Sequence, residues 1–167
     1  MSLDLIYDRT ESDVNAADDI RAKYQALMDW SGLTDAEISQ LERGTLTNVT
    51  LNRVSAAVQT LAAELNAVGY TVEILPQTFA ETDTICLPQW RQYLANVQAL
   101  RDAYYTLAET GQLPGAEDRL DYIGANNIEK ILADIDLLIG WMKSSYRRCG
   151  TFRAGNNAAH LPLKGSA

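Results

Sequence analysis

The side chains that could take part in catalysis are few, and their spacing matches no catalytic or metal-binding pattern. The only histidine, His160, lies in a glycine- and asparagine-rich stretch near the end of the chain, with no patterned serine or cysteine partner. Neighbouring acids could do acid–base chemistry, although acids on the polar face of a helix are usually solvated. The pairs are Asp18/Asp19, Glu117/Asp118 and Asp134/Asp136. There is no phosphate-binding glycine loop, HExxH pattern or calcium-loop spacing. We therefore expect no enzyme activity, no cofactor and no metal site.

The composition is typical of a globular domain. Apolar residues make up 47% of the 167 residues and charged residues 22%, which excludes a disordered chain. No apolar run is long enough to cross a membrane, and the acidic N-terminus lacks the features of a signal peptide. We therefore expect that the protein is made in the cytoplasm and does not insert into a membrane. Cys86 and Cys149 have no metal or redox spacing, so two free thiols are the simplest interpretation and a disulfide stays open.

The element that must organise the chain is a long amphipathic helix predicted over Asn126–Arg148. Asn126 and Glu129 have the spacing of a capping box, with Asn127 between them. Apolar residues then recur at intervals of three and four, which places a broad apolar stripe on one face. Gly150 is a natural end. The residues of the stripe are Ile128, Ile131, Leu132, Ile135, Leu138, Ile139 and Met142.

Similar signals predict the other helices. Thr10 is a plausible cap for a helix that runs to about Trp30, and Thr34 with Glu37 forms a capping box for a short helix ending at Gly44. Further helices are expected over 51–69 and from Pro88 to about Ala108. The predicted fold is all-α: a bundle of about four main helices plus one short helix, with a long connector at 70–87. We place the bundle domain at 1–150 and an extended C-terminal arm at 151–167.

The helix that begins near Asn52 resembles the later one at an offset of 74 residues. Asn52 aligns with Asn126, and the apolar phase agrees over four turns. Any two amphipathic helices can be aligned in this way, so the match is either chance or the trace of a duplicated helical hairpin. The aligned apolar pairs are Val54/Ile128, Ala57/Ile131, Val58/Leu132, Leu61/Ile135 and Leu65/Ile139.

The charge is distributed unevenly. Residues 1–140 hold all 22 acidic residues and nine of the 14 basic ones, whereas 141–167 hold five basic residues and no acid. The basic end either matches the helix dipole or docks on an acidic face of a second copy or partner. Nucleic acid is a poor partner for so acidic a body. The candidate partner contacts are Trp90, Tyr105, Lys143, Arg147, Arg148 and Arg153.

Four strings within residues 5–155 form a combined pattern, namely IYDRTESDV, TLNRVSAAVQTLAAEL, LDYIGANNIEKILADIDLLI and RRCGTFRAG. Taken together, they resemble phage and prophage tail or baseplate proteins of Gram-positive bacteria. The motif residues are Asn52 and Arg53 in the second string and Asn126, Asn127 and Glu129 in the third. The chain departs from the pattern at Ser55, where Glu is usual, and at Arg148-Cys149, where an aromatic residue is more usual.

The resemblance implies a non-enzymatic structural or adaptor module of a tail tip, baseplate or fibre attachment region. It implies location in the virion, other phage structural proteins as partners, and a homo-oligomer. Two other functions stay open at this point. One is a host-surface or glycan-binding module of the same virion, which would use exposed aromatic residues near Trp90 or in 77–87. The other is a small prophage-encoded protein of different function.

Overall fold

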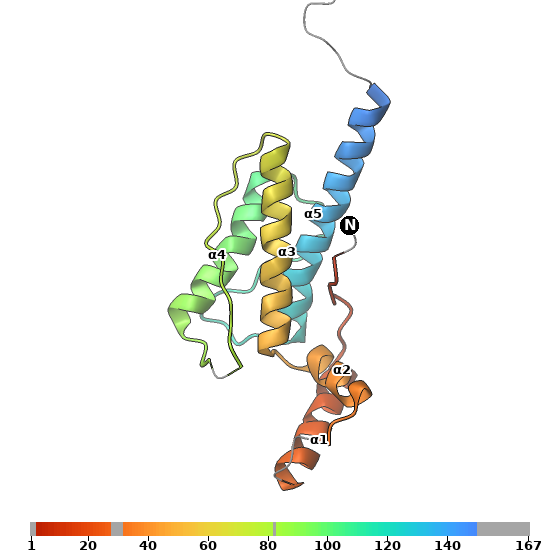
Figure 1. Cartoon of the computed structure of the whole chain (residues 1–167), viewed down its shortest axis with the longest axis vertical. Coiled ribbons are helices and arrows are strands. Elements are labelled where there is room, and N and C mark those ends of the chain that lie inside the picture. Colours follow the sequence, from red (N-terminus) through yellow and green to blue (C-terminus); the bar gives the residue numbers. More distant parts are fainter. Residues whose placement is uncertain (1–2, 28–31, 82, 150–167) are drawn as a thin grey trace, which may run out of the picture.

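The computed structural model describes residues 3–27, 32–81 and 83–149, and this part of the chain is all-α, as predicted (Figure 1). It contains four longer helices and one short helix and no strand. The predicted C-terminal arm, 151–167, lies outside the described residues. The helices are α1 (Glu11–Leu27), α2 (Asp35–Gly44), α3 (Asn48–Ala67), α4 (Leu87–Ala103) and α5 (Tyr122–Cys149).

Helices α3, α4 and α5 pack side by side and form the bundle that encloses the hydrophobic core (Figure 1). Each contributes fully buried side chains, for example Leu61, Val97 and Leu132. Burying one such side chain stabilises a fold by about 1.5–3 kcal/mol. The residues that the apolar repeat aligns are all buried, so α3 and α5 present equivalent faces to the core. These residues are Val54, Ala57, Val58, Leu61 and Leu65 in α3, and Ile128, Ile131, Leu132, Ile135 and Ile139 in α5.

Helices α1 and α2 form a separate lobe at one end of the bundle, packing mainly on each other (Figure 1). Helix α2 buries none of its residues, while α1 buries Ala17 and Tyr24. Gly44 lets the end of α2 approach α1 closely, because a Cβ there would lie 2.3 Å from the Asp13 carbonyl oxygen. Polar contacts also join the two helices, because Glu37 of α2 accepts hydrogen bonds from Lys23 of α1 at 2.7 Å and from the Tyr24 hydroxyl at 2.8 Å.

The connector between α3 and α4 is extended and wraps the bundle. Three asparagines hold it in the same way, each accepting from the N–H and donating to the carbonyl of one connector residue. Asn66 binds Val72, Asn96 binds Leu75 and Asn52 binds Phe79, at 2.8–3.0 Å. We call this two-bond contact an asparagine clamp. The clamps satisfy backbone groups that have no strand partner, which permits burial of the Val72 and Phe79 side chains.

Some predicted helix boundaries are wrong and others are confirmed. The capping box of Thr34 and Glu37 is present, Pro88 lies in the first turn of α4, and Gly69 follows α3 with φ of +99°. Helix α3 begins at Asn48, before the predicted start, because the Thr47 hydroxyl accepts from the Thr50 N–H. Helix α4 ends at Ala103 rather than near residue 108.

The boundary error that matters most for the contacts below concerns α5, which begins at Tyr122 and not at Asn126. The Asp121 carboxylate accepts from the Gly124 N–H at 2.7 Å and so occupies the capping position. Asn126 and Glu129 therefore lie inside the helix, and the capping box predicted for them does not exist. Both side chains are instead used in contacts with distant parts of the chain.

Candidate functional site: the interlobe junction and its cleft

Arg9 joins the lobe to the bundle at a buried junction. Its side chain is 4% exposed and donates to Glu129 Oε1 at 2.5 Å, to the Arg43 carbonyl at 3.0 Å and to the Ile6 carbonyl. Glu129 belongs to α5, whereas Arg43 lies in the last turn of α2. One guanidinium thus contacts the bundle, the lobe and the N-terminal segment, which fixes their relative positions.

Glu129 is the buried acid at the centre of this junction. Its side chain is 2% exposed and accepts from Arg9, from Arg53 at 3.0 Å and 3.3 Å, and from the Ile6 N–H at 2.5 Å. A buried carboxylate is tolerable only when such partners replace its hydration. Burial and the charge of Glu129 together raise the pKa of the neighbouring Tyr93. Donors from Arg9, Arg53 and Ile6 contact this one carboxylate, which therefore links the N-terminal segment and α3 to α5.

Asn126 forms a fourth asparagine clamp beside Glu129. It accepts from the Arg9 N–H at 3.0 Å and donates to the Arg9 carbonyl at 2.8 Å. Its repeat partner, Asn52, makes the same two bonds to Phe79, so the two aligned residues share a contact as well as a sequence position. Asn127 lies against Gly111, where a Cβ would come within 2.3 Å of its Oδ1.

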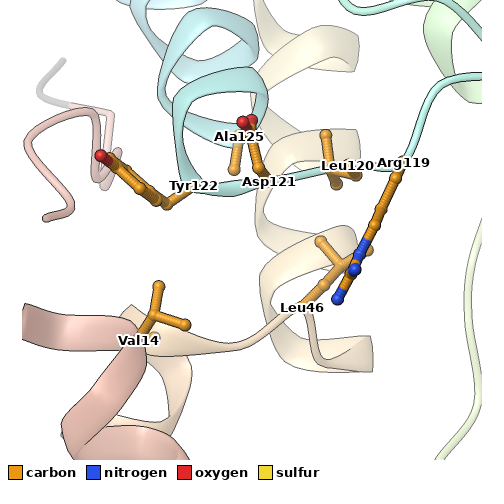
Figure 2. A pocket seen from close by; sticks show the side chains of 8 residues that line it. Val14, Leu46, Arg119, Leu120, Asp121, Tyr122 and Ala125 are labelled. Atoms are coloured by element: carbon orange, nitrogen blue, oxygen red, sulfur yellow. The ribbon is translucent and has the colours of Figure 1, made fainter. Parts of the chain in front are cut away.

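A cleft of about 500 Å³ opens between the lobe and the first turn of α5. Figure 2 shows Val14 and Leu46 on one side and Leu120, Asp121 and Tyr122 on the other, with the Arg119 side chain extending toward Leu46. The lining is mostly apolar, and Asp121 is already engaged in capping α5. The cleft could accept an apolar or aromatic side chain of a partner, but it brings no nucleophile and base together.

The predicted partner contacts are scattered. Trp90 stacks on Tyr93 with ring centres 5.2 Å apart and packs against the core. Tyr105 is 68% exposed, and Lys143 forms an ion pair of 3.1 Å with Glu64. Arg147 and Arg148 belong to the last turn of α5, but their side chains lie outside the described part, as does Arg153 entirely. Cys86 is an exposed free thiol.

Sequence reasoning assigned no role to Arg9, Asn66 or Asn96. The only sequence signal for Arg9 was its place in the string IYDRTESDV. Nothing local marks an asparagine that clamps a segment far away in the chain, because such a side chain is equally compatible with a solvated helix face.

Comparison with protein-family models, curated protein sequences and solved structures gave no match to this chain. None of the described helices combines the length and the apolar character that crossing a membrane requires. Among the described residues, no group of three or more His, Cys, Asp or Glu side chains is placed to hold a metal ion.

Proposed function

We propose that this chain is a non-enzymatic structural or adaptor module of a phage or prophage tail, acting in a tail tip, baseplate or fibre attachment region through protein–protein contacts. In this proposal it is a homo-oligomer in the virion and binds other phage structural proteins. The observation that carries the proposal is the junction described above. Residues of three separate motifs of the tail-protein resemblance meet in it: Arg9, Arg53 and Glu129.

The role of these residues supports a scaffold rather than a reaction centre. All three charges are paired within the chain, and Asn52 and Asn126 of the same motifs clamp the backbone. The motif residues thus define how the lobe, the connector and the bundle are held. The cleft and several exposed apolar side chains remain available for contacts with partners.

Reconstitution with tail proteins encoded by neighbouring reading frames tests the proposal. The purified chain should form a stable complex with at least one of them in size-exclusion chromatography with light scattering. Tyr122→Lys, at the cleft, should weaken a complex that uses the cleft, while Leu75→Lys, on the connector, is the matched control. A chain that stays monomeric at high concentration and binds no tail protein would count against the proposal.

The glycan-binding alternative is weaker. Trp90, its predicted aromatic platform, is partly covered by stacking on Tyr93 and by the core. Titration with cell-wall polysaccharide, followed by tryptophan fluorescence, separates the two functions. An unchanged spectrum is expected for the structural module, and a saturable change would favour the glycan-binding module.

A further inference from the structure

The second half of α5 presents an uncovered face. Ala133, Leu137, Gly140 and Ser144 recur at intervals of four, three and four residues on the side opposite the core stripe, which is the spacing of a coiled-coil seam. Leu137 is 45% exposed, and Trp141, beside this seam, is 56% exposed. Figure 1 shows α5 continuing past the ends of α3 and α4, where the bundle no longer covers it.

Gly140 is the least expected residue on this face. Glycine in a helix interior costs about 1 kcal/mol relative to alanine, so it normally has a packing reason. At Gly124, in the first turn of α5, that reason is visible, because a Cβ would lie 2.9 Å from Cδ1 of Leu120. At Gly140, apart from the backbone of its own helix turn, no atom of the described residues lies within 4 Å of the Cβ position. The described chain therefore supplies no reason for this glycine, whereas the close approach of another backbone would.

A shallow groove continues the same face toward the N-terminal segment. Its volume is about 290 Å³, and it runs between α5 and the extended segment that precedes α1. Apolar side chains from both sides line it, and charged side chains of α5 lie along it as well. The apolar ones are Leu3, Leu5, Tyr7, Ala133 and Leu137, and the charged ones are Lys130, Asp134 and Asp136. An indole ring arriving beside Leu137 would enter this groove and lose its contact with water, which is the kind of burial that drives association.

The charge along α5 selects the direction in which a second helix can pack. From Tyr122 to Asp136 the helix carries three acids, of which Glu129 and Asp134 are buried in ion pairs of the chain itself and only Asp136 can face a partner. From Leu137 to Cys149 it carries three basic residues and no acid. A parallel pair would place the basic ends together. An antiparallel pair that crosses at Gly140 separates the basic ends and brings Lys143 of each helix near Asp136 of the other, on both sides of a two-fold axis.

We propose that two copies of this chain pair through antiparallel α5 helices that cross at Gly140. The Trp141 side chain of each copy occupies the groove formed by Leu3, Leu5, Tyr7 and Leu137 of the other. The partner is thus a second copy of this chain, and each groove is complete only when that copy contributes its indole. The pairing rests on the proposed function only in that it gives the proposed homo-oligomer a specific interface.

Sedimentation velocity of the full chain over a range of micromolar concentrations tests the pairing. We expect a monomer–dimer equilibrium that Trp141→Lys weakens at least tenfold. Leu75→Lys, which replaces a leucine that is 63% exposed on the connector, should leave the equilibrium unchanged. Circular dichroism checks that both variants fold. A monomer at all concentrations, or a dimer that is insensitive to Trp141→Lys, overturns the pairing. If the chain is a monomer that still binds tail proteins, the pairing is overturned but the proposed function is not.

Two further measurements address the close approach and the direction. Gly140→Ala should raise the thermal stability of the dilute monomer, since alanine favours helix, yet weaken dimerisation severalfold, since the added methyl separates the helices. Equal or tighter dimerisation overturns the crossing at Gly140.

Spin labels attached to Ile123→Cys, in a chain with Cys86→Ser and Cys149→Ser, measure the direction of the pair. They should lie about 50 Å apart in the antiparallel pair, from a helical rise of 1.5 Å per residue. A separation of about 10 Å, close to the interaxial distance of packed helices, overturns the antiparallel direction.

Discussion

The α3–α4–α5 bundle and the α1–α2 lobe are both helical, but different forces hold them. The bundle contributes nearly all of the continuous hydrophobic core, together with the connector residues that the asparagine clamps hold against it. The lobe buries no residue of α2 and is held by ion pairs, the capping box of Thr34 and Glu37, and the close approach at Gly44. Helical pattern alone therefore does not show which helices form the folding core. Apolar burial shows it, because surface ion pairs contribute little to stability.

The largest expected effect is at the junction between the two regions. Glu129→Gln removes the charge that pairs with Arg9 and Arg53 and leaves two largely buried guanidinium groups without a counter-charge. We expect a loss of about 3–5 kcal/mol in the free energy of unfolding. Urea denaturation monitored by circular dichroism measures it. Glu117→Gln, at the exposed ion pair with Arg91, is the control and should change stability by less than about 1 kcal/mol. Equal effects of the two substitutions would show that the junction is not energetically special.

Truncation of an apolar side chain should destabilise the protein much more in the bundle than in the lobe. Leu61→Ala creates a cavity in the bundle core, where the leucine is fully buried, and should destabilise the protein by about 2–5 kcal/mol. Ile38→Ala, in the lobe, removes a side chain that is 41% exposed and should change the free energy of unfolding by less than about 1 kcal/mol. Thermal unfolding of both variants makes the comparison, and similar losses would contradict a core confined to the bundle.

A smaller loss is expected when a clamp is removed. Asn96→Ala leaves the N–H and carbonyl of Leu75 without their partner and should reduce the free energy of unfolding by about 1–3 kcal/mol. Hydrogen exchange of the Leu75 amide should accelerate in the same variant. Gln98→Ala, which removes an exposed hydrogen bond to Asp102 on the same helix, is the matched control. An unchanged Leu75 exchange rate in Asn96→Ala would show that the connector does not depend on its clamp.

The smallest effect is the pH dependence of the lobe. Hydrogen bonds from the Thr10 N–H and hydroxyl lower the pKa of Asp13 to about 2, and the Lys23 ammonium and Thr34 N–H lower the pKa of Glu37 to about 2. The unfolded chain binds these protons more readily, so the stabilisation is complete above the usual carboxyl pKa and is lost as the pH falls toward 2. We expect α1 and α2 amide signals in NMR spectra to weaken before those of α3 between about pH 4 and pH 2. Asp13→Asn with Glu37→Gln should flatten this dependence, and simultaneous loss of all helices would contradict it.

The helices and their apolar faces could be predicted from the sequence because both depend on local spacing. Five of the seven residues of the predicted α5 stripe are buried, and the other two, Leu138 and Met142, are half-buried. The junction could not be predicted, because Asn126 and Glu129 have the spacing of a capping box whether they begin a helix or lie within one. Only the tertiary structure shows that Asp121 caps α5 and that Glu129 faces Arg9 and Arg53. The asparagine clamps could not be predicted for a related reason, because no local sequence pattern indicates which distant residue each asparagine contacts.

The central claim is that the bundle is the folding core and that the lobe is joined to it through Arg9. Native-state hydrogen exchange is the most direct test of this claim. Amides of α3 and α5, such as those of Leu61 and Leu132, should exchange only through global unfolding. Amides in the middle of α1 and α2 should exchange through an opening of clearly lower free energy, and Arg9→Ala should lower that value further. A single free energy of exchange shared by α1, α3 and α5 would contradict the division of the molecule into these two regions.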